Sequence, residues 1–174
     1  MVMKTIFALA LFLLFCYPIA AQTDSGKPTF VEYTMDGTRV DVEKLRGKVV
    51  VLNLWFINCP NCIEEIKLLN SLVDEYQGNS EVVFLAPAAS KKTDLQKFLA
   101  KNPFKYQVIP DAAITILTKF GKPDKDGNLS VPFPMHFVLD RDGKIVVKEQ
   151  GIKGIDKVKS ELKRQFSAKT TAKL

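Results

Sequence analysis

Residues 47–62 read GKVVVLNLWFINCPNC, and this segment indicates the fold more strongly than any other. Val49 to Ile57 form a nearly continuous apolar run rich in β-branched and aromatic residues, as expected of a central strand covered on both faces. The run leads directly to Cys59 and Cys62, which are spaced as C-x-x-C. Proline is favoured at the first position of a helix, because its ring presets the backbone angle and its missing N–H has no helical partner there. Pro60 therefore predicts a helix that begins at the cysteines.

The predicted turn places Cys59 at the cap of this helix. Unpaired N–H groups of the first turn and the positive end of the helix dipole stabilise a thiolate there, and a thiolate is the nucleophile in disulfide exchange. Cys62 lies about one turn further on, on the same side of the helix. We expect Cys59, ionised and open to solvent, to attack a partner's disulfide, and Cys62 to resolve the mixed disulfide. In reverse, the same pair would oxidise a dithiol.

A structural disulfide is the alternative interpretation of this cysteine pair. A framework disulfide usually closes a long loop and so restrains the unfolded chain, whereas a bridge across two residues restrains very little. Stability is therefore a weak reason to keep the pair, and reactivity is the favoured interpretation.

The first residues have the pattern of a secretory signal peptide. Lys4 is followed by an apolar run over residues 6–15 and by small residues that end at Ala21, after which we predict cleavage. This run is shorter than the roughly 20 residues that span a bilayer, and no later segment is both long and uncharged enough to do so. We expect a soluble, periplasmic or otherwise exported protein without a membrane span. Cys16 leaves a lipid-anchored precursor as an alternative, although the bulky Phe15 before it fits that processing poorly.

Composition indicates one exported domain. The 174 residues carry 25 Lys and Arg against 19 Asp and Glu, a net charge of +6. Loss of residues 1–21 leaves about 153 residues, a comfortable size for a single domain with its own core, and a net charge of +5. The basic residues are scattered among acids, which is typical of a solvated surface. We predict a monomer with no nucleic-acid partner. Its two remaining cysteines, Cys59 and Cys62, can pair in an oxidising compartment.

Strands alternate with helices along the rest of the chain, which predicts an α/β fold with helices on both sides of a mostly parallel sheet. An Asp-Gly turn at Asp36 closes an N-terminal hairpin. Thr93 is expected to cap a helix, Gly78 to end the helix that starts at Pro60, and residues 121–134 to form a loop. The expected strands cover residues 29–33, 38–42, 49–57, 81–86, 106–109, 135–140 and 144–150, and further helices cover 93–101, 112–120 and 155–166.

Three segments resemble the TlpA/ResA-like branch of the thioredoxin superfamily. They are residues 47–62, the preceding hairpin with LRGK at 45–48, and PMHFVLDRDGK at 134–144. The resemblance implies a thioredoxin-like fold, in which helices flank a central mixed β-sheet and a β-hairpin is added at the N-terminus. The implied organisation is a removed signal peptide at 1–21, a flexible leader at 22–27, the thioredoxin-like domain at 28–166 and a basic tail at 167–174.

The same resemblance implies a protein thiol–disulfide oxidoreductase that needs no cofactor and serves cell redox homeostasis. Its partners would be exported proteins with disulfides or dithiols and an upstream thiol donor. Because the branch mainly reduces its partners, a reductase is expected. The residues between the cysteines leave the direction open, since C-x-x-C proteins span reduction potentials of roughly −270 to −120 mV.

Site roles follow from the same resemblance. Pro134 matches a cis-proline that lies beside the redox pair and positions the partner's backbone, with Pro132 as the competing candidate. Phe133, which precedes it, is expected to contact the partner. Glu65, three residues after Cys62, matches an acid that handles protons near the thiols; a buried carboxylate could accept or return the proton of Cys62. A solvated helix glutamate is the alternative.

Some positions depart from the family pattern. Asn53 stands where thioredoxins themselves carry a buried acid, which moves any proton-handling role toward Glu65. Asn58 replaces a tryptophan common before the first cysteine, and Phe133 replaces threonine or valine. These changes alter the surface offered to a partner, so partner identity is not carried over from the family.

His136 is the only histidine in the chain. It lies two residues after Pro134 on a predicted strand, and a histidine satisfied by its neighbours is the simplest interpretation. Two thiolates and one histidine could instead hold Cu(I), which keeps a copper-delivery module with Cys59, Cys62 and His136 as an alternative. A closed zinc site would need a fourth ligand, so no metal is expected. A thiol peroxidase is the other alternative, although Cys59 lacks the threonine-proline setting of that family.

Overall fold

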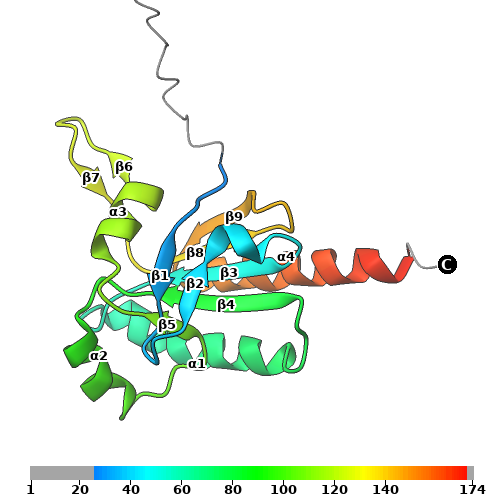
Figure 1. Cartoon of the computed structure of the whole chain (residues 1–174), viewed down its shortest axis with the longest axis horizontal. Helices are drawn as coiled ribbons and strands as arrows, with labels where there is room; N and C mark the ends of the chain where they lie inside the picture. The colour runs from blue at the N-terminus through cyan, green and yellow to red at the C-terminus, as the bar shows by residue number, and fades with distance from the viewer. Residues whose placement is uncertain (1–25, 172–174) are drawn as a thin grey trace, which may run out of the picture.

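A mixed five-stranded sheet forms the centre of the molecule (Figure 1). The structure, a computed structural model, describes residues 26–171; the predicted signal peptide, Cys16 and most of the leader lie outside them. The strand order is β5-β4-β3-β8-β9, and β3, β4 and β5 are parallel while β8 and β9 are antiparallel to their neighbours. This confirms the predicted mixed sheet. The strands are β3 (Val49–Leu54), β4 (Val82–Pro87), β5 (Gln107–Ile109), β8 (Met135–Leu139) and β9 (Ile145–Gln150).

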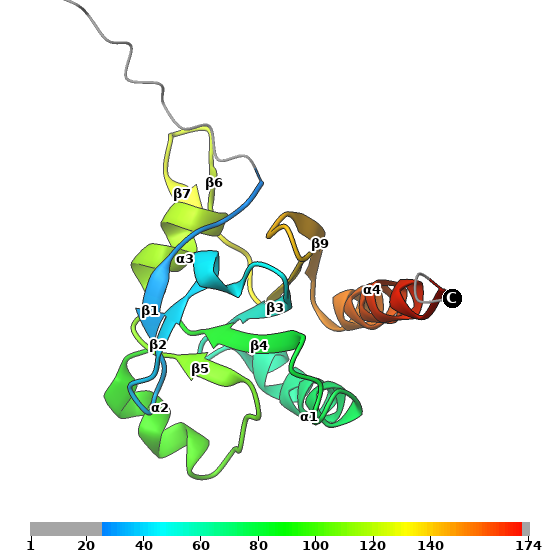
Figure 2. The same cartoon turned by 45° about the vertical axis from the view of Figure 1, so that its right-hand side comes forward.

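Helices cover both faces of the sheet, so every residue of β3 is buried. Successive side chains of a strand point to opposite faces, and Val49 and Val51 accordingly share one apolar cluster while Val50 and Leu52 belong to another. The first cluster packs against α1, α2 and α4, and the second against α3 and a 3-10 helix η1; Figure 2 shows this division. The helices are α1 (Pro60–Glu75), α2 (Lys92–Leu99), α3 (Ala113–Phe120), α4 (Ile152–Thr171) and η1 (Val42–Leu45).

The N-terminal hairpin is present as predicted. Strands β1 (Val31–Tyr33) and β2 (Arg39–Asp41) pair antiparallel, and Gly37 in the turn has a φ of +85°, which favours glycine. Asp36 accepts hydrogen bonds from the Thr34 hydroxyl and the Thr38 N–H, and these bonds hold the pKa of its carboxyl below the ordinary value. The hairpin is tied to the sheet because the N–H of Met35 donates to the carbonyl of Val108 on β5, at 2.9 Å.

Residues 121–134 are not wholly irregular, which corrects the predicted loop. Two short strands, β6 (Lys122–Pro123) and β7 (Leu129–Ser130), pair as a second hairpin. Asp124 closes its turn by accepting bonds from the N–H groups of Asp126 and Asn128, both at 2.9 Å. Strands of two residues have no hydrophobic period to read, so the pattern could not reveal them.

Thr93 does not cap α2, so that prediction is wrong. The helix begins at Lys92, with Lys91 in the cap position and no hydrogen bond from its side chain. The carbonyl of Lys91 already accepts from the N–H groups of Asp94 and Leu95. Thr93 therefore lies inside the first turn instead of before it.

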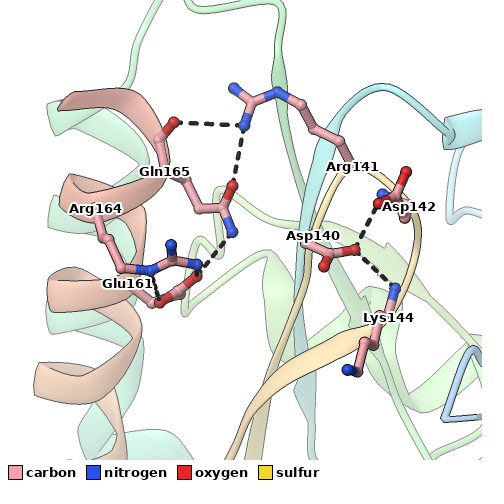
Figure 3. A network of polar contacts seen from close by, with 7 residues as sticks. All are labelled: Asp140, Arg141, Asp142, Lys144, Glu161, Arg164 and Gln165. Atoms are coloured by element: carbon pink, nitrogen blue, oxygen red, sulfur yellow. Dashed lines mark hydrogen bonds and ion pairs between the residues drawn. The ribbon is translucent and has the colours of Figure 1, made fainter. Parts of the chain in front are cut away.

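Helix α4 is longer than expected, since it runs from Ile152 to Thr171 and takes in the start of the predicted basic tail. The turn between β8 and β9 anchors its far half, as Figure 3 shows. Asp140 closes that turn by accepting from the N–H groups of Asp142 and Lys144, and Arg141 donates to the backbone and side-chain oxygens of Gln165 on α4.

Candidate active site

The cysteines lie where β3 gives way to α1. The strand ends at Leu54, three residues earlier than predicted, and a turn carries the chain to Cys59, the N-cap of α1. Pro60 is the first helical residue, as expected. The N–H of Cys62 donates to Sγ of Cys59 at 3.2 Å, and the two cysteines form a disulfide with their Cα atoms 5.2 Å apart. The predicted cap position is confirmed.

The disulfide lies just beneath the surface. Cys59 is 6% exposed and Cys62 is 3% exposed in this disulfide form. The expected accessibility of the Cys59 thiolate belongs to the reduced form and stays a prediction. Both cysteines belong to the apolar cluster that contains Trp55 and Ile66. The residues beside Cys59 in the chain are more accessible; they are Asn58, Pro60 and Asn61. These three residues therefore form the exposed surface next to the disulfide.

The loop before β8 carries the one cis peptide bond of residues 26–171, between Phe133 and Pro134. Pro134, and not Pro132, is thus the cis-proline. It is buried, and its carbonyl accepts from the N–H of Gly151 at 3.2 Å. The ring of Phe133 lies edge-on to that of Phe56, with centroids 5.2 Å apart. Since Phe56 comes shortly before Cys59, this contact joins the proline loop to the cysteine loop.

Glu65 is fully buried, at 0% exposure, whereas its neighbour Glu64 is not. The alternative of a solvated helix glutamate is therefore wrong. Residues three apart on a helix have Cβ atoms about 5–6 Å apart, so the Glu65 carboxyl group starts one turn behind Cys62 on the buried side of α1. A carboxylate in such a place needs a polar partner, because burial of an unpaired charge is costly.

His136 supplies that partner. Its Nε2 atom lies 3.1 Å from Oε2 of Glu65, and both side chains are 1% exposed. Its Nδ1 atom lies 3.2 Å from the amide nitrogen of Asn53, which stands opposite it in the β3–β8 register and is 2% exposed. The Glu65–His136 contact lacks hydrogen-bond geometry, since neither the Glu65 carboxylate nor Nε2 has a hydrogen-bond partner among the described residues.

This row of three polar groups faces the cysteine side of the sheet. On β3, Asn53 alternates with Val50, Leu52 and Leu54 of the opposite cluster, and on β8 His136 shares its face with Val138 of the cysteine cluster. The sequence prediction treated Asn53 and His136 separately. Each is the one polar residue in an otherwise apolar strand. This shared feature was the sequence signal that could have indicated their contact.

The surroundings of His136 bear on the metal alternative. Both ring nitrogens of His136 face protein groups, and within residues 26–171 no three His, Cys, Asp or Glu side chains are placed to hold a metal ion. In this disulfide form both sulfurs are bonded to each other, so the Cu(I) alternative concerns the reduced protein and stays a prediction.

Comparison with known proteins now identifies the family. The Redoxin family model matches residues 22–164. The chain belongs to the Redoxin family. Among curated relatives, this redoxin is 28% identical over 128 residues to a thiol-disulfide oxidoreductase ResA of Bacillus cereus, an alignment that covers 73% of this chain and 69% of the relative. It is 24% identical over 127 residues to the thioredoxin-like protein YneN of Bacillus subtilis, covering 73% and 71%.

Solved structures agree on the fold. A putative thiol:disulfide interchange protein DsbE from Chlorobium tepidum superposes on this redoxin with a TM-score of 0.64 at 25% identity, over 82% of this chain and 94% of that one. A putative protein disulfide isomerase from Bacteroides thetaiotaomicron gives a TM-score of 0.68 at 20% identity, over 79% and 86%. These findings confirm the resemblance to the TlpA/ResA-like branch and the thioredoxin-like fold. With the paired cysteines, they identify this redoxin as a thiol–disulfide oxidoreductase.

Proposed function

We propose that this redoxin is an exported reductase of protein disulfides, with Cys59 as the attacking and Cys62 as the resolving cysteine. The observation that carries the proposal is the cap geometry. Sγ of Cys59 already accepts a backbone N–H of the first turn at 3.2 Å, and the same N–H and the helix dipole would stabilise a thiolate. Cys62 stands within bonding distance, as the disulfide itself demonstrates.

The reaction would run in two exchanges that together carry two electrons. The Cys59 thiolate attacks one sulfur of the partner's disulfide, so that a mixed disulfide forms and the other partner sulfur leaves as a thiolate that takes a proton from water. Cys62 then loses its proton and attacks Cys59. The enzyme disulfide closes, and the second partner sulfur leaves. The partner is reduced, the redoxin is oxidised, and an upstream thiol donor restores the dithiol, which would serve cell redox homeostasis.

Three neighbouring residues complete the proposed site. Glu65 would accept the proton that Cys62 gives up, because it is a buried carboxylate one turn away on the same helix. Pro134 and Phe133 would contact the partner, because their loop joins the cysteine loop through Phe56. Asn58 and Phe133 differ from the family pattern, so the partners of relatives are not assigned to this redoxin.

Export rests on the predicted signal peptide at residues 1–21, and the proposed domain on residues 28–166. Within residues 26–171, no helix is both long and apolar enough to span a membrane. The proposed partners are exported proteins with disulfides and a thiol donor in the same compartment.

Trapping tests the function. A Cys62→Ser protein lacks the resolving thiol and should accumulate mixed disulfides through Cys59, which mass spectrometry of an exported-protein fraction would identify. A Cys59→Ser protein should accumulate far fewer. Equilibration with glutathione buffers tests the direction, and a potential near the oxidising limit of about −120 mV would refute the reductase. Sustained peroxide turnover by Cys62→Ser with an external thiol would favour a thiol peroxidase instead.

A further inference from the structure

His136 lies beside Glu65, and the described residues show no hydrogen bond from its ring to either cysteine sulfur. Its Nε2 atom is the polar atom that faces the Glu65 carboxylate, at 3.1 Å, and both groups are almost fully buried. Neither the Glu65 carboxylate nor Nε2 has a hydrogen-bond partner among residues 26–171, so proximity and not an aligned hydrogen bond joins the two groups. An isolated carboxylate is costly to bury and a hydrogen-bond donor offsets part of that cost, so the two groups depend on each other.

Asn53 determines which ring nitrogen carries the hydrogen. Its amide nitrogen lies 3.2 Å from Nδ1 of His136, and an amide nitrogen can only donate. With the amide in this orientation Nδ1 accepts, which leaves the ring hydrogen on Nε2. The nitrogen that carries the hydrogen is then the one that lies 3.1 Å from the Glu65 carboxylate, and a nearby N–H dipole favours the ionised form of a carboxylate.

The surroundings leave His136 little freedom to adopt another role. Gly154, in the first turn of α4, lies so close that a Cβ atom there would come within 3.0 Å of the imidazole Cδ2. The buried residues of α4 are apolar; they are Ile155, Val158 and Leu162.

Few other titratable groups face this pair. On β9, Glu149 stands opposite His136 in register, but it is exposed. On α1, the groups beside Glu65 are the cysteines, and on β3 the facing group is the neutral Asn53. Apart from the cysteines, Glu65 and His136 are therefore the two titratable groups that face each other in this buried layer.

We propose that His136, held in its Nε2–H form by Asn53, is a positioning residue that keeps Glu65 ionised and ready to take the proton of Cys62. This inference rests on the proposed role of Glu65 and extends it, because the acid then works as one part of an Asn53–His136–Glu65 row. The chemistry places no proton on His136 during turnover. Its Nε2–H remains in place while the Cys62 proton passes to the Glu65 carboxylate.

NMR gives a direct test that does not depend on activity. Because His136 is the only histidine of the chain, ¹⁵N signals of an untagged, oxidised protein report its tautomer without ambiguity. The expected result is the Nε2–H form at neutral pH. Asn53→Asp would accept from Nδ1 instead, and should move the hydrogen to Nδ1 or protonate both nitrogens. A wild-type ring with its hydrogen on Nδ1 would overturn the proposal.

Kinetics test the consequence. Reduced protein is mixed with an excess of an aromatic disulfide whose released thiol absorbs light, and two thiols appear in sequence, the first on attack by Cys59 and the second on resolution by Cys62. The rate of the second phase should fall at low pH, and this fall is its acidic limb. In His136→Leu, the acidic limb should move to higher pH by about one unit, so that resolution at pH values below the limb is about tenfold slower than in the wild type. His136→Gln, which can still offer an N–H, should restore most of the wild-type profile.

The control variants separate the possible failures. Glu64→Gln lies beside the site, outside the buried face, and should keep the wild-type profile. Glu65→Gln should lose the acidic limb of the second phase, and adding His136→Leu to it should change nothing more. If Glu65→Gln itself left the limb intact, the proposed role of Glu65 would fail. If Glu65→Gln removed the limb but a folded His136→Leu protein kept it, only the role of His136 would fail. Thermal unfolding of each variant identifies loss of fold.

Discussion

The N–H of Cys62 donates to Sγ of Cys59 at 3.2 Å, across the first turn of α1. This contact is made by the backbone, so substitution of the Cys62 side chain leaves it in place. A sulfur that accepts such a bond at a helix N-terminus is prepared to carry negative charge. The relationship links the local turn to the proposed nucleophile.

Alkylation of Cys59 should therefore be fast near neutral pH. In a reduced Cys62→Ser protein, the rate of reaction with iodoacetamide should be half-maximal well below about pH 8.5, the ordinary value for a free cysteine. The same protein unfolded in guanidinium chloride is the control and should show the ordinary value. Equal profiles for the folded and unfolded protein would contradict the thiolate assignment.

Phe133 should matter for protein partners and not for small disulfides. Its ring packs edge-on against Phe56 and is only half-buried, which leaves apolar surface for a partner. Phe133→Ala should slow reduction of a protein disulfide about fivefold, the effect of losing roughly 1 kcal/mol at an interface, and leave oxidised glutathione unaffected. Ile114→Ala, on α3 and 78% exposed at the wild-type residue, is the control for a general loss of surface.

Helix α1 should contribute to the free energy of unfolding through its buried face and not through its exposed face. Leu69 is 1% exposed, whereas the adjacent Leu68 is 41% exposed. Leu69→Ala should lower the free energy of unfolding by about 2–5 kcal/mol, because it removes buried methyl groups and leaves a cavity. Leu68→Ala should change it by about 0.5 kcal/mol or less. Urea denaturation compares the two, and similar losses would contradict the packing of α1.

Replacement of Gly154 by alanine should lower stability, which is the opposite of its usual effect in a helix. Replacing glycine by alanine inside a helix normally stabilises it by about 1 kcal/mol. Here the new Cβ would come within 2.9 Å of the Glu149 Cβ and 3.0 Å of the His136 ring, and the buried ring cannot move aside freely. Gly154→Ala should destabilise the protein by about 1–3 kcal/mol in urea denaturation. Lys153→Ala, at the exposed neighbouring position, should be nearly neutral.

Tyr106 should make stability fall at high pH. Burial raises the pKa of its hydroxyl, and that hydroxyl has no hydrogen-bond partner among the described residues. The folded state therefore keeps Tyr106 neutral, while the unfolded state ionises above about pH 10. The contribution of Tyr106 to the free energy of unfolding is complete below about pH 10 and is lost as the pH rises further.

The Tyr106→Phe variant checks this sign. It should match or exceed wild-type stability at about pH 7, because no hydrogen bond is lost, and its free energy of unfolding should fall less between about pH 9 and 11. Tyr33→Phe, at a residue that is 57% exposed, should follow the wild-type curve. A steeper fall for Tyr106→Phe would show that the hydroxyl is not buried and neutral.

Local sequence was sufficient for the elements around the cysteines. The apolar run from Val49 predicted a strand buried on both faces, and Pro60 predicted the helix start, because strand burial and helix capping are set by neighbouring residues. The spacing of Cys59 and Cys62 likewise predicted their pairing. Boundaries were less accurate, since β3 stops at Leu54 where the chain turns toward the cysteines.

The tertiary structure alone decided which residues meet across the sheet. The family resemblance favoured Pro134 as the cis-proline and kept Pro132 as the competing candidate. The sequence left Glu65 either buried or solvated, because one helix face can lie against a core or against water. Asn53 and His136 are 83 positions apart, and their contact exists because β3 and β8 pair in one register. Side-chain identity and short-range spacing determined the redox pair; the long-range pairing of strands determined the polar row behind it.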